Sequence, residues 1–237
     1  MLRLLLLSNS TDAAGRYLEW PRAHLRDFLG PSVREVLFVP FAGVSISWDA
    51  YAERVRGAVE GAGYRLAAAH QAPDAVTAVN QADAIAIGGG NTFYLLARLY
   101  DTGLLAAIRD RVRGGTPYVG WSAGSVVACP TIRTTNDMPI VEPPSLAALG
   151  LVPFQINAHY TDFHPPGFRG ETRAERLAEF VTANPGVPVL GLPEGTLLRV
   201  EGSDMRVLGA PTSAEQVPLF GVPGRSDVPI GKRLPLA

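Results

Sequence analysis

Short runs of consecutive apolar residues recur along the chain, and longer stretches that mix polar and apolar residues separate them. Such runs are typical of strands buried on both faces, because a strand with one face in water alternates apolar and polar positions. The pattern predicts strands at residues 2–7, 36–39, 64–69, 84–87, 118–121 and 187–192. A further short run, residues 154–158, directly precedes a histidine.

The stretches between these runs carry apolar residues at the spacing of a helix face, which we interpret as core packing. They predict helices within residues 22–29, 48–59, 93–100, 104–112 and 171–183. Alternating strands and helices need crossover connections, which place a mainly parallel sheet between helices on both faces. We therefore predict a single α/β domain over residues 1–237.

The end of the chain loses the helical period. Residues 196–200 and 205–208 predict an antiparallel β-hairpin at a sheet edge, because a Glu-Gly-Ser-Asp turn separates two apolar runs there. Residues 211–235 contain many prolines and are expected to be the most loop-like part of the protein.

Composition narrows the class of protein. Of 237 residues, 47% are hydrophobic and 18% charged, which is enough apolar material for a substantial core. The formal net charge of -1 provides no global field for nucleic acid or an anionic membrane. The first apolar run is shorter than the roughly 20 residues of a membrane span and lacks a signal-peptide cleavage pattern. The single cysteine, Cys129, allows no disulfide within the chain and fits a reducing cytoplasm.

Chemistry is expected at the carboxyl ends of the predicted strands, where open parallel sheets place their sites. Ser122 lies there, in the segment Gly120-Trp121-Ser122-Ala123-Gly124, between an apolar run and a short helical stretch. This is the context of a nucleophile elbow, in which small residues let the chain turn sharply from strand to helix. The N–H of Ala123 and the helix dipole would then face a developing oxyanion.

A second strand end carries Gly88-Gly89-Gly90-Asn91-Thr92. Glycines expose backbone N–H donors and suit a second contribution to an oxyanion hole. The structural alternative is a tight turn with Asn91 or Thr92 as a helix N-cap, and the pattern alone leaves both interpretations open. A phosphate site is disfavoured, because the segment lacks both the Walker lysine and the GxGxxG spacing.

A serine nucleophile needs a base, and His159 lies at a predicted strand end, unlike His24, which lies in a predicted helix. The histidine in turn needs an acceptor that fixes its tautomer. Glu194 and Asp137 are rivals for this role, and the sequence leaves the choice open. A metal site is disfavoured, because no cysteine or third histidine lies near His159 and His164.

Arg173 falls in the first turn of a predicted helix, where a cation opposes the helix dipole. The arginine is either a solvated surface residue or a clamp for a substrate carboxylate, which a guanidinium binds in bidentate fashion.

Six segments occur together and in order: residues 88–91, 120–125, 134–140, 156–160, 170–173 and 191–195. The set resembles peptidase E, the α-aspartyl dipeptidases of the S51 serine peptidase family. The resemblance implies a fold similar to class I glutamine amidotransferases, which use cysteine at the position of Ser122. The order serine, histidine, glutamate also differs from that of α/β-hydrolases, which argues against an ordinary esterase.

The resemblance further implies hydrolysis of dipeptides with an N-terminal aspartate, without a metal or another cofactor. Its implied roles are Ser122 as nucleophile, His159 as base, Glu194 as third triad member, Asp137 as a catalytic-site residue of open role, Gly90 and Ala123 as oxyanion donors, and Arg173 and Asn91 as substrate-binding residues. The expected partner is a small peptide, and neither nucleic acid nor a membrane. A homodimer is compatible with the sequence, which leaves the oligomeric state open.

Three alternatives accompany this prediction. One is a cyanophycinase-like relative that cleaves β-linked aspartyl peptides, which the short chain disfavours. Another is a non-catalytic small-ligand-binding relative that retains the elbow. A structural or interaction protein ranks last, because it needs no convergent serine, histidine and glutamate at strand ends.

Overall fold

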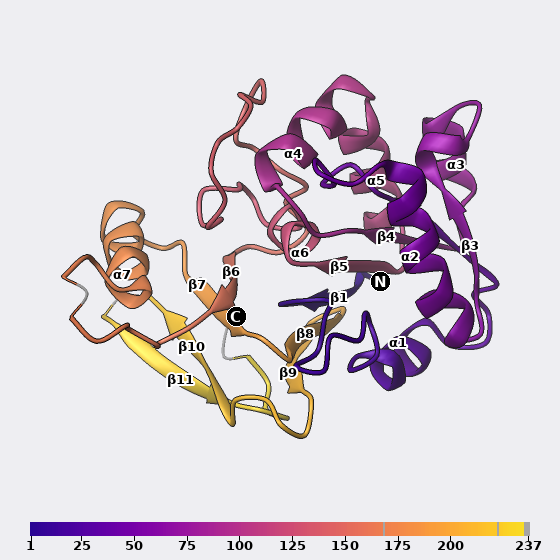
Figure 1. Ribbon diagram of the computed structural model, residues 1–237. Helices are drawn as coiled ribbons and strands as arrows, with labels where there is room; N and C mark the ends of the chain where they lie inside the picture. The colour runs from indigo at the N-terminus through magenta and orange to yellow at the C-terminus, as the bar shows by residue number, and fades with distance from the viewer. Residues whose placement is uncertain (168, 222, 235–237) are drawn as a thin grey trace.

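The computed structural model describes residues 1–167, 169–221 and 223–234, which form two sheets and their covering helices (Figure 1). The larger sheet has seven strands in the order β3-β2-β4-β5-β1-β8-β9. Its strands are β1 (Arg3–Leu7), β2 (Glu35–Val39), β3 (Arg65–Ala68), β4 (Ala84–Ile87), β5 (Tyr118–Trp121), β8 (Thr196–Glu201) and β9 (Asp204–Gly209). The first five are parallel, and the antiparallel β8–β9 hairpin forms one edge, which confirms both predictions.

Helices cover both faces of this sheet. The helices of the described residues are α1 (Arg22–Leu29), α2 (Trp48–Gly61), α3 (Ala75–Gln81), α4 (Thr92–Asp101), α5 (Leu104–Arg113), α6 (Ala123–Val126) and α7 (Arg173–Ala183), with a short 3₁₀ helix at Ala69–Gln71. The apolar run of strand β1 is explained by burial on both faces of the sheet. Leu4 and Leu6 pack with α4 and α5, whereas Leu5 and Leu7 pack with α1 and α2 on the opposite face. None of the described helices is both long and apolar enough to cross a bilayer.

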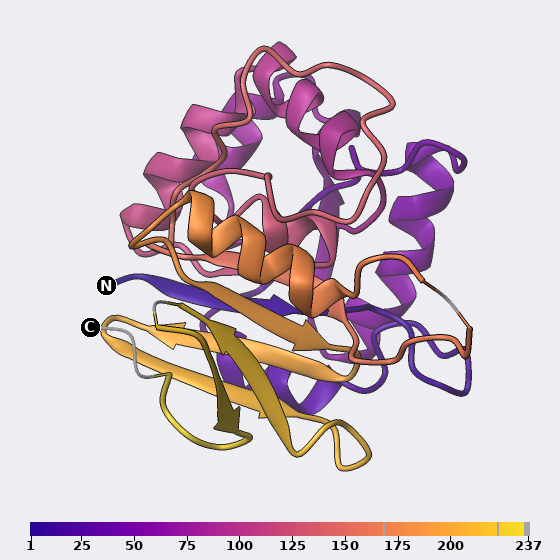
Figure 2. The same ribbon diagram turned by 90° about the vertical axis from the view of Figure 1, so that its left-hand side faces the viewer.

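A second sheet of four strands has the order β11-β10-β7-β6. It contains the parallel pair β6 (Gln155–Tyr160) and β7 (Val189–Pro193), extended by the antiparallel strands β10 (Gln216–Phe220) and β11 (Arg225–Pro229). Helix α7 packs on this sheet through Leu177 and Val181 (Figure 2). The largest apolar cluster includes residues of both sheets, among them Leu6 of β1 and Leu190 of β7.

The expectation that residues 211–235 are the most loop-like part of the protein was wrong, because β10 and β11 lie in this stretch, whereas residues 127–154 contain neither a helix nor a named strand. Strand β11 is an edge strand in which four of the five residues are exposed, among them the terminal proline, so it has neither an apolar run nor a clear alternation. Strand β11 pairs with β10, and β10 pairs with β7. This pairing between strands stabilises the extended conformation, which the local sequence pattern does not indicate.

Candidate active site

Ser122 occupies a sharp turn between β5 and α6. Its backbone has φ 53° and ψ -115°, a conformation that costs a non-glycine residue about 1–3 kcal/mol. The flanking glycines are needed for close approach: a Cβ on Gly120 would lie 2.4 Å from the carbonyl oxygen of Gly124, and one on Gly124 would lie 2.1 Å from that of Ile87. The small residues of the segment therefore let α6 fold back against β4 and β5.

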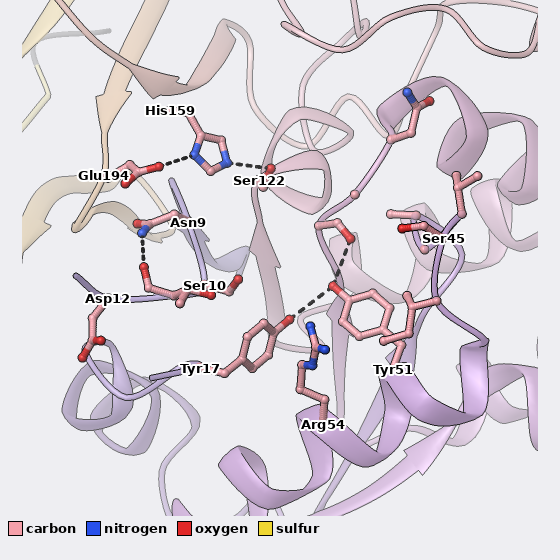
Figure 3. Close-up of a pocket in the computed structure, with 18 of the residues that line it drawn as sticks. Asn9, Ser10, Asp12, Tyr17, Ser45, Tyr51, Arg54, Ser122, His159 and Glu194 are labelled. Carbon is pink, nitrogen blue, oxygen red and sulfur yellow. Dashed lines mark hydrogen bonds and ion pairs between the residues drawn. The ribbon is translucent and has the colours of Figure 1, made fainter. Parts of the chain in front are cut away.

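Ser122, His159 and Glu194 form a continuous hydrogen-bonded series (Figure 3). The Ser122 Oγ lies 2.9 Å from His159 Nε2, and His159 Nδ1 lies 2.8 Å from Glu194 Oε1. The side chains of His159 and Glu194 are 41% and 66% exposed, so water screens any attraction between their charges. The effect of Glu194 that remains is to hold the imidazole with its proton on Nδ1, which leaves the Nε2 lone pair toward Ser122.

His159 also has a left-handed backbone, with φ 53°, at an irregularity in the pairing of β6 with β7. Its N–H donates to the Oγ of Ser8 at 2.9 Å, and Ser8 Oγ donates to the carbonyl of Leu192 at 2.7 Å. The guanidinium of Arg173 donates to the His159 carbonyl at 3.1 Å. These contacts hold the backbone of His159 through both its N–H and its carbonyl, and so fix the position of the imidazole.

The end of β1 holds the neighbouring turn as well. Asn9 Oδ1 accepts a hydrogen bond from the N–H of Gly195, directly after Glu194, at 2.8 Å. Sequence reasoning missed Ser8 and Asn9. Both directly follow the first apolar run, so they stand at the carboxyl end of a strand, where the other candidates were sought.

Asp137 does not contact the imidazole. Its Oδ2 accepts from the N–H of Thr92 at 2.8 Å, from the Thr92 hydroxyl, and from Thr135 Oγ1 at 3.1 Å. The alternative prediction, that Asp137 is the acceptor that orients His159, is therefore wrong. The carboxylate that contacts Nδ1 of the imidazole is that of Glu194. Asp137 instead lies at the amino end of α4, where the helix dipole favours an anion.

Asn91 is the N-cap of α4. Its Oδ1 accepts from the N–H of Tyr94 at 3.0 Å, and its Nδ2 donates to the carbonyl of Met138 at 2.9 Å. The side chain thus ties the glycine turn to the loop that carries Asp137.

Gly90 lines the larger cavity beside Ser122, and Ala123, which directly follows the serine, lines the smaller one. No described residue accepts a hydrogen bond from the backbone N–H of either residue. Gly90 has φ 137°, and a Cβ there would lie 2.1 Å from the carbonyl oxygen of Ala42, so no other residue fits. Two unpaired donors beside a serine are the arrangement that an oxyanion hole requires.

Two cavities meet at the serine. The larger, of about 700 Å³, is lined by Gly90, Glu194 and the aromatic pair Tyr17 and Tyr51 (Figure 3). The smaller, of about 190 Å³, is lined by Ala123, Asp137 and Arg173. Among the residues that the structure describes, only Ser122 and His159 line both cavities. A bond held at Ser122 would thus have one side in each cavity.

Arg173 is half-buried in the smaller cavity. Burial, with the nearby cation of Arg176, lowers the pKa of the Arg173 guanidinium, which nonetheless remains charged. Among the described residues, no three histidine, cysteine, aspartate or glutamate side chains cluster in a way that would hold a metal ion. His70, another of the histidines, contacts Asp49 at 2.9 Å and lines neither of the two cavities.

Comparison with known proteins places the chain in a family. The chain is 50% identical over 210 residues to a peptidase E from Nostoc sp., covering 89% of this chain and 87% of that protein. It is 52% identical over 214 residues to a peptidase E from Streptomyces coelicolor, covering 90% and 86%. In fold it is similar to the crystal structure of a peptidase from an acI-B1 Actinobacterium, with a TM-score of 0.73 and 18% identity over 99% of this chain and 96% of that one. The profile of Peptidase family S51 matches residues 4–208, and the protein belongs to this family.

Proposed function

We propose that the protein hydrolyses dipeptides with an N-terminal aspartate through an acyl-enzyme on Ser122. The observation that carries the proposal is the hydrogen-bonded series from Ser122 through His159 to Glu194, next to a small cavity that contains the cation of Arg173. The similarity to proteins named peptidase E supports the same class of reaction.

Acylation begins at the short contact between serine and histidine. His159 Nε2 takes the proton of Ser122 as Oγ attacks the carbonyl carbon of the N-terminal residue. The negative charge that develops on the carbonyl oxygen is stabilised by the N–H groups of Gly90 and Ala123. Glu194 stabilises the imidazolium that forms and keeps it oriented.

Collapse of the tetrahedral intermediate breaks the peptide bond. The imidazolium returns its proton to the leaving amine, and the second residue departs through the larger cavity. A water then gives its proton to His159 and attacks the ester carbonyl. The ester bond breaks as His159 passes that proton to Ser122 Oγ, which releases the N-terminal residue and restores the enzyme.

Selectivity for aspartate rests on the smaller cavity. The Arg173 guanidinium binds the β-carboxylate of the substrate, and a neutral side chain would leave this half-buried cation without a partner. We also propose a reducing compartment, the cytoplasm, for which the support is a single cysteine that is buried and unpaired.

Hydrolysis of three dipeptides tests the proposal, with a chelator present throughout: Asp-Leu, Leu-Leu and β-linked Asp-Leu. We expect cleavage of Asp-Leu alone, lost by several orders of magnitude in Ser122→Ala. Cleavage of the β-linked peptide would instead favour a cyanophycinase-like activity. A folded protein that cleaves none of the three would be a binding relative, and wild-type rates in Ser122→Ala would end the assignment of the nucleophile.

A further inference from the structure

The smaller cavity contains two opposite charges that do not pair with each other. Arg173 and Asp137 both line this space of about 190 Å³. Within the described ranges, neither forms an ion pair with the other or with a third residue. Opposite charges that stay apart in so small a cavity are available to a ligand that carries both signs.

Each of the two groups is held at one end and available at the other. Asp137 uses Oδ2 for its contacts with Thr92 and Thr135, and no described residue donates to Oδ1. Arg173 donates one Nη to the carbonyl of His159 and keeps its other N–H groups without an acceptor in the described part of the chain. The cavity therefore offers one anionic acceptor and one cationic donor at fixed positions.

An N-terminal aspartate carries the complementary pair of charges. Its α-ammonium and its β-carboxylate are on adjacent carbons, so both enter the cavity when the residue does. We propose that Asp137 binds the α-ammonium of the substrate while Arg173 binds the β-carboxylate. The inference rests on the proposed function, and it makes a free amino terminus a requirement of this enzyme.

Other carboxylates near the serine are already committed. Of the two cavities at the serine, Glu194 lines the larger one, and it contacts His159. Asp12 is bound to Arg16. Asp137 is the one carboxylate that lines the smaller cavity among the described residues. Its contact with the first turn of α4 is a structural role as well, but that role uses one oxygen and would affect every substrate equally.

The test compares Asp-Leu with succinyl-Leu, in which hydrogen replaces the α-ammonium and the distal carboxylate is kept. We expect the wild-type kcat/KM to favour Asp-Leu by about 10-fold to 100-fold, the range of a charge-assisted hydrogen bond. In Asp137→Asn this preference should fall to within about threefold, because Asp-Leu alone is slowed. Glu142→Gln, which changes an exposed carboxylate of the same loop, should leave both rates unchanged.

The opposite results separate the two levels of the argument. An equal loss on both substrates in Asp137→Asn, with Asp-Leu still cleaved by the wild type, would make Asp137 a structural residue and overturn this inference alone. A wild type that does not cleave Asp-Leu would remove the proposed function and the inference with it. If Asp137→Asn does not fold, two other measurements test the inference. Equal kcat/KM values of the wild type for Asp-Leu and succinyl-Leu would overturn it. Equal dissociation constants of Ser122→Ala for the two peptides would overturn it as well.

Discussion

Two residues of the site hold left-handed backbones without being glycine, and each is fixed by its neighbours. The N–H of Ser122 donates to the carbonyl of Leu7 at 3.1 Å, and that of His159 donates to the Ser8 hydroxyl at 2.9 Å. Strained conformations persist only where the surroundings over-determine them. The end of β1 therefore supports the nucleophile and the base together.

Replacement of Ser8 by alanine tests this support. The variant leaves the His159 N–H without an acceptor, which costs about 1–3 kcal/mol, and it frees the imidazole to move away from Ser122. We expect kcat for Asp-Leu to fall about tenfold or more with KM little changed. Steady-state kinetics and a thermal melt measure the effect, with exposed Ser226→Ala as control. A wild-type kcat in Ser8→Ala would show that the contact does not position the base.

Arg173 is expected to determine selectivity more than stability. In Arg173→Ala the preference for Asp-Leu over Asn-Leu should fall by about 10-fold to 100-fold, because the half-buried charge that rejects a neutral side chain is gone. Arg176→Ala, on the same helix and with its guanidinium exposed near Glu171, should retain the preference. The ratio of kcat/KM for the two dipeptides is the measurement. An unchanged ratio in Arg173→Ala would exclude the arginine from substrate recognition.

At the scale of elements, close approach at the elbow makes a specific demand on one glycine. Gly124→Ala would place a Cβ 2.1 Å from the Ile87 carbonyl oxygen, so α6 must move away from β4. We expect a loss of about 3 kcal/mol or more in the free energy of unfolding, and a loss of activity. Gly57→Ala, in the exposed interior of α2 with nothing within 4 Å, should instead stabilise the protein by about 0.5–1 kcal/mol. Urea denaturation of both variants tests the contrast, which equal stabilities would contradict.

How far the sequence predicts each element depends on what buries it. The parallel strands are apolar because helices cover both faces of the sheet, as the packing of β1 shows. Their apolar runs in the sequence therefore predict these strands. The seven-residue α3 buries only Val79 fully, too little for a helical stripe, and β11 is an exposed edge. Similarly, the choice between Glu194 and Asp137 depends on β6 pairing with β7, which brings the end of β7 to His159. No local pattern indicates that pairing.

At the scale of the molecule, the site lies where the two sheets meet. Ser122 follows β5 of the larger sheet, whereas His159 and Glu194 belong to β6 and the end of β7 in the smaller one. Ser8 and Asn9 bridge the gap from β1 to both of these strand ends. The relative position of the sheets therefore sets the distance from nucleophile to base, and the shared apolar core sets that position.

Cys129 provides a probe of this shared core. The thiol is fully buried in the largest apolar cluster, and burial raises its pKa to about 12. Since only the thiolate reacts, the native protein should resist thiol reagents at pH 8 and keep its activity, whereas the protein unfolded in guanidinium should label at once. A raised pKa of an acid stabilises the folded state below the unfolded pKa of 9.0, and this contribution is lost as the pH rises toward about 12.

The labelling rate of Cys129 should therefore follow global unfolding, and should increase in Gly124→Ala by the factor that its loss of stability implies. Rapid native labelling at pH 8 with unfolding too rare to account for it would mean that the core opens locally at the junction of the sheets. In that case the distance between Ser122 and His159 would vary with the same motion, and kcat would fall in parallel with the labelling protection across destabilised variants.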